Sequence, residues 1–457
     1  MEHYQAVIIG SGQGGTPLSK KLASAGWKTA LVEKAFIGGT CVNVGCTPTK
    51  TMISSARTAY LIAESGSRGV RSSKPEVDIR EVINLKNKIV AKFRNGSEKG
   101  LEATENLTVI HGEAIFSREK TLRIKFKDGP DTEISADKIF IDIGTRPNIP
   151  KIEGLEDIRY LTSSTILDLE EIPGHLVVIG GNYIGLEFGQ MYKRFGSNVT
   201  ILEKSERLLK KEDEDVSEEM HKILTEEGME ILFNEKTKKI TPSAGGFQLI
   251  TDSGKTIIGT HLLIATGRIP NTDNLNSQIP GVDLDDKGFI RVNGKLETSV
   301  KDIYAIGDVT GGPAFTHISY NDYIVIAANL LNGENRTTEG RQVPFCMFTD
   351  PQLGRVGMTE AEAKAKGIKY VVAKIPMAQV ARAIETGETR GLMKALVDEK
   401  TNEILGAAII GTEGGETMTV VQMAMLGKIK AAEIREMIFA HPLYAESLNN
   451  LFMSLEK

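Results

Sequence analysis

The sequence predicts an α/β protein with two Rossmann-like dinucleotide-binding domains, one inserted in the other, and a C-terminal α+β domain. Two segments repeat the order strand, glycine turn, helix, strand and acidic residue. Each repeat is closed by a similar later strand, and the pattern changes after Val343-Pro344. A length of 457 residues agrees with roughly three domains at about 150 residues per domain.

The first repeat begins with an apolar strand from Ala6 and continues with an amphipathic run from Thr16 to Ala25. Its turn carries the glycines Gly10, Gly12 and Gly15. They fit the G-x-G-x-x-G fingerprint, and Glu33 follows the last of them by 18 positions. A carboxylate at about 20 positions is typical of one that binds a ribose 2′-hydroxyl.

The second repeat begins at Leu176 and has the same spacing, with Gly180, Gly185 and Glu203, but Asn182 replaces the middle glycine. Asparagine tolerates a left-handed backbone better than most residues, so we expect the turn to survive and the nucleotide to approach less closely. A single glycine motif of this kind also occurs in ordinary tight turns of α/β proteins. Two copies with equal spacing favour two dinucleotide sites.

The closing strands are Lys138–Pro147 and His261–Pro270, and this repetition predicts an insertion of one domain in the other. A later strand ends at Gly307-Asp308, where the aspartate is either a turn former or a ribose or ribityl partner. The predicted boundaries are 1–150 and 273–343 for the first domain, 151–272 for the inserted domain and 344–457 for the C-terminal domain.

Composition excludes several classes of protein. The 55 Lys and Arg against 60 Asp and Glu give a charge of −5, which argues against a nucleic acid partner. No apolar run reaches the length of a membrane span, and Ala6–Ile9 is too short for a signal peptide, so we expect a cytoplasmic protein. Cys41, Cys46 and the distant Cys346 lack the four ligands of structural zinc, and no metal is expected.

The most specific segment is Gly-Gly-Thr-Cys-Val-Asn-Val-Gly-Cys-Thr-Pro-Thr-Lys, residues 38–50. Cysteines five apart on an ideal helix are too distant for a disulfide, so the turn must be distorted if Cys41 and Cys46 pair. Gly45 and Pro48 stand where such a distortion is tolerated. The alternative is two buried thiols, but the flanking glycines and the nearby dinucleotide turn favour a chemical role.

Through these motifs the chain resembles the FAD-dependent pyridine nucleotide–disulfide oxidoreductases from Tyr4 to near Lys457. The resemblance implies an FAD-binding first domain, an NAD(P)-binding inserted domain and a C-terminal dimerisation domain that forms a homodimer. It implies that Cys41 attacks the substrate and Cys46 lies against the flavin. It also places Lys50 near the reactive edge of the flavin, paired with Glu187.

Further roles follow from the same resemblance. The stretch Ala440-His-Pro-Leu-Tyr-Ala-Glu446 resembles the family's His-Pro motif, which makes His441 the acid/base and Glu446 its partner; a lone His before Pro is otherwise an ordinary surface residue. The residues implied for FAD are Gly10, Gly12, Gly15, Glu33, Gly39, Thr40, Lys50, Gly112, Ala114, Gly144, Asp308, Phe315 and Thr316. Those implied for the nucleotide are Gly180, Gly185, Glu203, Gly267 and Tyr183, the last as an aromatic gate.

The motifs also separate subfamilies. Ala381-Arg-Ala383 and the cysteine segment resemble mercuric reductases, but no cysteine follows Cys346 and the chain begins at the flavin motif, so we expect poor mercury handling. Residues 307–323 and 355–360 look most like the reactive-chlorine-resistance flavoproteins, which reduce small oxidants such as hypothiocyanous acid. Glu203 favours NADH, with NADPH as the alternative. The alternatives in function are dihydrolipoyl dehydrogenase and a non-catalytic redox-sensing flavoprotein.

Overall fold

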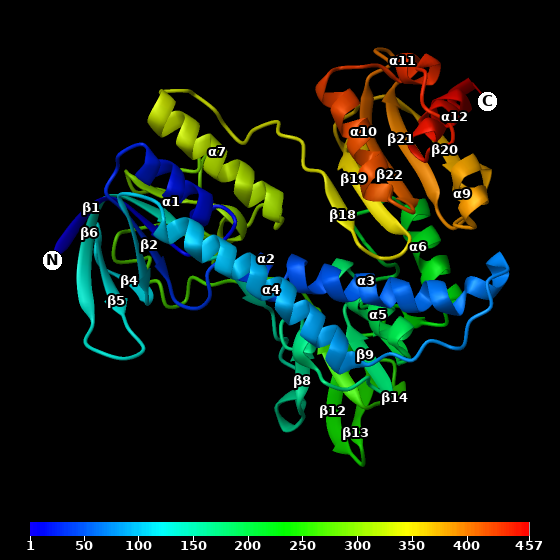
Figure 1. The fold of residues 1–457 in the computed structure, drawn as a ribbon, viewed down its shortest axis with the longest axis horizontal. Coiled ribbons are helices and arrows are strands. Elements are labelled where there is room, and N and C mark those ends of the chain that lie inside the picture. Colours follow the sequence, from blue (N-terminus) through cyan, green and yellow to red (C-terminus); the bar gives the residue numbers. More distant parts are fainter. Residues whose placement is uncertain (457) are drawn as a thin grey trace. The chain divides into compact units, whose positions relative to one another are not determined.

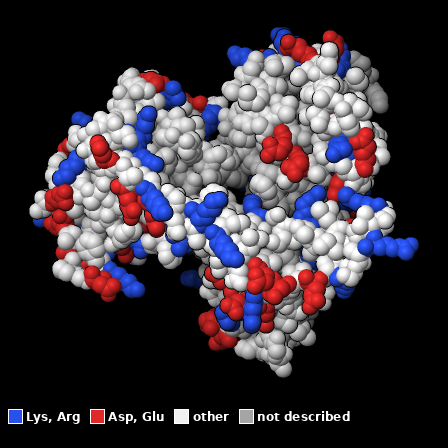
Figure 2. All heavy atoms as spheres, in the orientation of Figure 1, with Lys and Arg blue, Asp and Glu red and all other residues white. Residues whose placement is uncertain are grey.

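The structure, a computed structural model, describes residues 1–456 of the chain. The chain divides into two compact units. The first contains residues 1–51, 83–148 and 267–341, and the second contains 52–82, 149–266 and 342–457. Among the described residues, no helix is both long and apolar enough to cross a membrane. On the face drawn in Figure 2, cationic and anionic side chains are interspersed over the surface.

The first unit is built on a seven-stranded sheet in the order β3-β2-β1-β6-β5-β4, with β17 paired to β6. Its strands are β1 (Glu2–Ile9), β2 (Thr29–Glu33), β3 (Leu107–His111), β4 (Glu113–Arg118), β5 (Thr121–Lys125), β6 (Thr132–Ile141) and β17 (Ile303–Ala305). β1, β2, β3, β6 and β17 run parallel, whereas β4 and β5 form an antiparallel edge. The centre of the sheet, residues 6–9 of β1, 30–32 of β2 and 139–141 of β6, is continuously apolar and buried, because both faces of a parallel sheet are covered.

The glycine turn after β1 leads directly into a helix that packs on this sheet. α1 (Gly15–Ser24) follows β1 and lies beside α7 (Thr316–Asn332), as Figure 1 shows. Leu18 and Leu22 of α1 point into an apolar core with Ile8 and Leu31 of the sheet. The remaining elements of this unit are α2 (Gly39–Val44), the short pair β7 (Thr145–Pro147) and β16 (Arg268–Pro270), and most of α4 (Ile79–Glu102).

The second unit contains another parallel sheet, in the order β11-β10-β9-β15-β8. Its strands are β8 (Tyr160–Thr162), β9 (His175–Ile179), β10 (Asn198–Leu202), β11 (Glu230–Leu232) and β15 (His261–Ile264). A three-stranded antiparallel sheet accompanies it, made of β12 (Thr237–Ser243), β13 (Gly246–Thr251) and β14 (Thr256–Gly259). Helices α5 (Tyr183–Phe195) and α6 (Glu214–Glu226) belong here, with most of α3 (Cys46–Ala63).

The same unit holds the C-terminal antiparallel sheet, in the order β18-β19-β22-β21-β20. Its strands are β18 (Phe345–Met347), β19 (Gln352–Gly357), β20 (Tyr370–Pro376), β21 (Leu392–Asp398) and β22 (Ile404–Gly411). Its helices are α8 (Glu360–Ala365), α9 (Ala381–Thr386), α10 (Gly414–Leu426), α11 (Ala431–Glu436) and α12 (Leu448–Met453). α10 lies across β19 and β22 in Figure 1, and this packing buries Met418 and Val421.

Candidate active site

The glycine turn after β1 is closed by backbone contacts that only glycine permits. Gly10 has φ +101°, and a Cβ built on it would lie 2.3 Å from the carbonyl oxygen of Asp142. A Cβ on Gly15 would lie 2.2 Å from the carbonyl oxygen of Gly10. These distances leave no room for a side chain, and they direct the N-terminus of α1 towards the turn. Such a helix N-terminus is suited to a phosphate group.

The second repeat reproduces this geometry after β9. Gly180 has φ +117°, and a Cβ on it would lie 2.4 Å from the carbonyl oxygen of Ala265. A Cβ on Gly185 would lie 2.0 Å from the carbonyl oxygen of Gly180. The two turns therefore have the same construction, as the equal spacing in the sequence predicts.

Asn182 keeps the second turn intact by a different route from the expected one. Its backbone is extended, with φ −112° and ψ −179°, so Asn182 does not use the left-handed conformation by which it was expected to keep the turn. Instead, its side-chain oxygen accepts a hydrogen bond from the Tyr183 amide at 2.9 Å and caps helix α5. Asparagine is a favoured N-cap residue, which explains why it replaces glycine without disturbing the turn.

The acidic residues at the strand ends occupy matching positions. Glu33 accepts hydrogen bonds from the Ser11 amide at 2.9 Å, the Ser11 hydroxyl at 2.7 Å and the Ala35 amide at 2.8 Å. Glu203 accepts from the amides of Gly181 and Ser205, both at 2.8 Å. Each carboxylate is thus fixed beside its own glycine turn, where a ribose hydroxyl is bound in dinucleotide folds.

Asp308 lies in the first unit within a network that the sequence did not reveal. It accepts a hydrogen bond from the Thr145 hydroxyl at 3.0 Å, and Arg268 donates to Thr145. Burial raises the pKa of Asp308, and Arg268 and the Thr145 hydrogen bond oppose that rise. Thr145 and Arg268 stand in the two similar closing strands, so the repeated Gly-Thr-Arg-Pro and Gly-Arg-Ile-Pro motifs were the available signal.

The first unit fits an FAD molecule. The glycine turn supplies amides for the pyrophosphate, Glu33 is placed for a ribose, and Asp308 offers a carboxylate to a polyol. A Cβ on Gly39 would lie 2.9 Å from Cα of Gly12, so the two segments approach each other through glycines. Gly144 and Gly307 also have positive φ, at +61° and +70°. Backbone atoms of glycines therefore form much of the surface that fits FAD.

The two cysteines flank a break between helices. α2 ends at Val44, Gly45 has φ −130° and ψ −120°, and α3 begins at Cys46, which is the distortion expected for a reactive pair. Both cysteines are thiols, Cys41 half-buried and Cys46 exposed. The Cys46 sulfur lies 3.4 Å from the Thr316 hydroxyl. A hydrogen bond with Cys46, and then burial, raise the pKa of the Cys41 thiol.

The predicted acid/base pair forms in the second unit. Nδ1 of His441 lies 3.0 Å from both carboxylate oxygens of Glu446, so the carboxylate holds the tautomer with a proton on Nδ1. The His441 side chain is 67% exposed, against 28% for Glu446. Its other nitrogen, Nε2, therefore remains available to an incoming group.

Other predicted residues occupy ordered positions. In the second unit, Glu187 is buried and accepts the Phe348 amide at 2.8 Å, and the Tyr183 ring lies 5.1 Å from the Phe345 ring. Gly267 has φ +109°, Thr40 lies in α2 and Phe315 precedes α7. Gly112 packs closely, because a Cβ on it would meet Ile124 at 2.6 Å, and Ala114 is buried in β4. A pairing of Lys50 with Glu187 stays a prediction.

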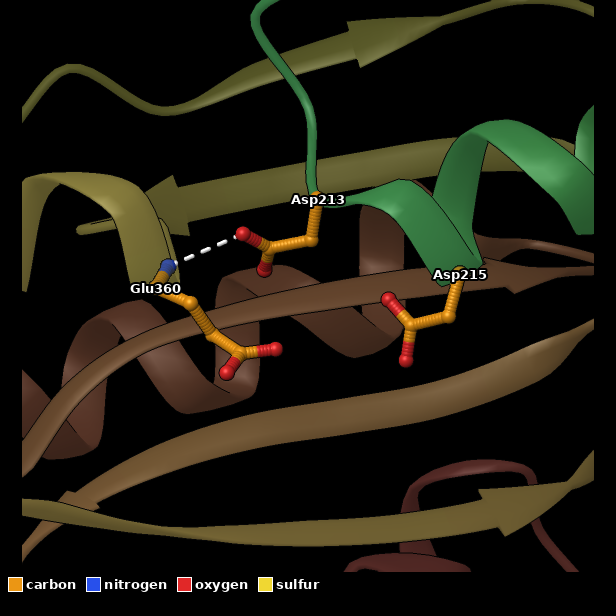
Figure 3. Close-up of side chains that lie close together, drawn as sticks. All are labelled: Asp213, Asp215 and Glu360. Carbon is orange, nitrogen blue, oxygen red and sulfur yellow. Dashed lines mark hydrogen bonds between the residues drawn. The ribbon is translucent and has the colours of Figure 1, made fainter.

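One acidic cluster resembles a metal site but already holds a cation. Figure 3 shows Asp213, Asp215 and Glu360 gathered near the N-terminus of α6, with the Glu360 amide bonded to Asp213 at 2.9 Å. The ammonium group of Lys394 lies 3.2, 2.7 and 2.6 Å from the three carboxylates. The buried Lys394 contacts all three carboxylates, so its ammonium group takes the position that a metal ion would need.

Comparisons with known proteins agree with this geometry. Residues 4–322 match the family described as pyridine nucleotide-disulphide oxidoreductase, and residues 343–452 match its dimerisation domain. The chain is 38% identical to the probable pyridine nucleotide-disulfide oxidoreductase RclA of Escherichia coli, over 99% of both chains. It is 34% identical to a mercuric reductase of Lysinibacillus sphaericus, over 100% of this chain and 83% of the relative.

A dihydrolipoyl dehydrogenase of Haemophilus influenzae is 33% identical, over 97% of this chain and 93% of the relative. Among solved structures, the copper(II) complex of the HOCl-induced flavoprotein disulfide reductase RclA from Escherichia coli superposes with a TM-score of 0.92, at 37% identity over 99% of both chains. The predicted fold class, enzyme class and FAD and NAD(P)H cofactors are thereby confirmed. With both domains matched over nearly its whole length, this chain belongs to the pyridine nucleotide-disulphide oxidoreductase family.

Proposed function

We propose that this enzyme reduces a small oxidant with electrons from NAD(P)H by cycling Cys41 and Cys46 between dithiol and disulfide. The observation that carries the proposal is the hydrogen-bonded thiol pair at the break between α2 and α3, within the unit that fits FAD. Bound FAD supplies hydride acceptance and two-electron transfer to a disulfide. Cys46 begins helix α3, and the positive end of the helix dipole stabilises a thiolate there.

The two thiols take different roles. With the charge on Cys46, Cys41 stays a neutral thiol until a base removes its proton, because its pKa is raised by Cys46 and by burial. We assign that base to Nε2 of His441 from a second copy of the chain, with Glu446 holding Nδ1. The match to the dimerisation domain supports a homodimer, and we propose that its two subunits share their active sites.

A homodimer would bury several large apolar side chains that are exposed in the C-terminal segment. Ile438 is 94% exposed and Leu426 is 69% exposed, although both are large apolar side chains. Met423, Met437 and Leu443 are also exposed near α10 and the His441 loop. Large exposed apolar side chains are typical of an interface, and because Met437, Ile438 and Leu443 flank His441 in sequence, we propose that the His441 loop lies at the subunit contact.

The acceptor we propose is an oxidant with an electrophilic sulfur, such as hypothiocyanous acid. The Cys41 thiolate attacks that sulfur and releases hydroxide, which leaves a Cys41–S–SCN adduct. The Cys46 thiolate then displaces thiocyanate and forms the Cys41–Cys46 disulfide. The net reaction converts NADH and HOSCN to NAD⁺, SCN⁻ and water, with two electrons transferred. The similarity to RclA, a disulfide reductase induced by HOCl, supports this class of acceptor.

A comparison of acceptors tests this assignment. We expect kcat/KM for hypothiocyanous acid to exceed that for oxidised lipoamide, glutathione disulfide and mercuric ion by about tenfold or more, a difference of about 1.4 kcal/mol. A higher value for lipoamide would instead identify a dihydrolipoyl dehydrogenase. A yellow protein that binds FAD but turns over none of the four would favour the redox-sensing alternative.

For the electron donor, we predict that NADH exceeds NADPH in kcat/KM. Glu203 lies beside the second glycine turn, where its carboxylate binds a ribose 2′-hydroxyl and repels a 2′-phosphate. One feature favours NADPH instead. It is a surface hollow of about 520 Å³ whose cationic lining would attract a 2′-phosphate, formed by Lys204, Arg207, Lys210 and Lys236 together with Glu206. Glu203→Ala should lower the ratio of kcat/KM for NADH to that for NADPH, and Arg207→Ala should raise this ratio. A tenfold advantage of NADPH in the wild type would contradict the Glu203 argument.

The domain boundaries and the cellular location are also part of the proposal. The boundaries 1–150, 151–272, 273–343 and 344–457 remain predictions for the FAD-binding, NAD(P)-binding, returning FAD-binding and dimerisation segments. A cytoplasmic location remains a proposal as well, supported by a dithiol mechanism that operates in a reducing compartment.

A further inference from the structure

The carboxyl group of Asp142 is buried in the floor of the first glycine turn. Asp142 directly follows β6 and is only 7% exposed. Its Oδ2 accepts a hydrogen bond from the Gly15 amide at 2.7 Å, at the start of helix α1. A Cβ built on Gly12 would lie 2.7 Å from Oδ2, and one built on Gly307 would lie 3.1 Å from Oδ1. The carboxyl group therefore lies between the turn that receives phosphate and the turn that carries Asp308.

The second dinucleotide turn shows that the fold does not require this carboxyl group. Gly10 packs on the carbonyl oxygen of Asp142, and Gly180 packs in the same way on the carbonyl oxygen of Ala265. Asp142 and Ala265 hold equivalent positions at the ends of the central strands β6 and β15. Since alanine serves the same backbone contact in the second repeat, this contact does not account for the carboxyl group of Asp142.

The surroundings of Asp142 disfavour a negative charge. Burial, and then the carboxylates of Asp308, Asp322 and Glu33, raise its pKa well above the usual value, and the Gly15 amide only partly opposes them. The neighbouring cations are already engaged, because Arg341 pairs with Asp322 and Arg268 binds Thr145 near Asp308. An anionic pyrophosphate bound at this turn would add further negative charge.

We propose that Asp142 is a cofactor-positioning residue that acts as a neutral carboxylic acid. Its Oδ2 accepts the Gly15 amide, and its Oδ1 hydroxyl provides a donor between the Gly12 and Gly307 turns for the pyrophosphate of FAD. FAD then binds the protonated form of the site, and affinity falls as rising pH removes that proton. This inference rests on FAD occupying the first glycine turn, as the function above requires.

The test is the pH dependence of FAD affinity, measured by the fluorescence of released FAD from about pH 6 to about pH 10. Above the titration of Asp142, the wild-type Kd should rise by up to about tenfold per pH unit, because only the protonated site binds. Asp142→Asn keeps both an acceptor and a donor without a charge. Its Kd should match the wild type near pH 6, stay flat, and be at least about tenfold lower than that of the wild type near pH 10.

Two controls make the result specific. Asp137→Asn removes a charge from the same strand, at a side chain that is 63% exposed, and should keep the wild-type pH profile. Asp142→Ala should also be flat with pH but should bind FAD more weakly than Asp142→Asn, because it lacks the donor. The proposal is overturned if Asp142→Asn shares the wild-type profile or binds FAD tenfold more weakly near pH 7.

Should Asp142→Asn fail to fold, the wild type alone decides the matter, since a flat profile through about pH 10 also overturns the proposal. These outcomes differ from a failure of the proposed function. A protein that cannot be reconstituted with FAD at any pH would refute the flavoenzyme itself. A yellow protein with a pH-independent Kd would refute only the role of Asp142.

Discussion

Replacing Cys46 with serine should abolish disulfide-forming turnover, with kcat/KM for the small oxidant reduced by about 10³-fold or more, because no second thiol can complete the disulfide. Replacing Cys41 should be equally severe, because the attacking sulfur is lost. The two variants differ in their spectra. Cys41→Ser should show a long-wavelength thiolate–flavin charge-transfer band without any reductant, since Cys46 is then a permanent thiolate. Cys46→Ser should lack that band under all conditions.

Cys346 provides the matched control for both variants. It lies in β18 of the second unit, with its sulfur 3.7 Å from Gln352, and we assign it no part in the reaction. Cys346→Ser should retain wild-type turnover, and the band should appear on reduction with dithionite or NADH. The reverse spectral pattern, with the band in Cys46→Ser and not in Cys41→Ser, would exchange the roles of the two thiols.

The backbone of the cofactor sites was predictable because glycine is constrained by local geometry. Gly10, Gly15, Gly180 and Gly185 stand where a Cβ would strike a carbonyl oxygen within 2.4 Å, so no other residue fits. The spacing of these glycines along the chain therefore predicts the conformation of each turn. The distortion between Cys41 and Cys46 was predictable for the same reason, because it is confined to residues adjacent in sequence.

The contacts of the buried charged residues were not predictable, because their partners are distant in sequence and meet only in the tertiary fold. Asp142 comes within hydrogen-bond distance of Gly15 across 127 positions, and Lys394 reaches Asp215 across 179. Periodicity contains no information about such pairs. Asn182 shows a related difficulty, because asparagine is compatible with both a left-handed backbone and a helix cap, and the choice between them depends on the folded structure.

Mixed dimers provide the second large effect, a recovery of activity from two inactive proteins. Cys41 and His441 stand 400 positions apart and belong to different compact units. If each His441 serves the partner's thiols, Cys41→Ser and His441→Ala homodimers should both be nearly inactive. Unfolding and refolding them together produces dimers in which one site carries both substitutions and the other carries neither. Such dimers should be active, although neither parent is.

The expected size of the recovery follows from symmetry. Random association makes half of the dimers mixed, and each mixed dimer has one intact site of two, so activity should reach roughly a quarter of the wild type. Refolding each variant alone is the control and should give no recovery. The His441→Ala protein should also keep its flavin spectrum, because His441 is not part of the unit that fits FAD. If mass measurements confirm mixed dimers and activity stays absent, His441 acts within its own chain or has no part in the reaction, because a site shared between subunits must complement.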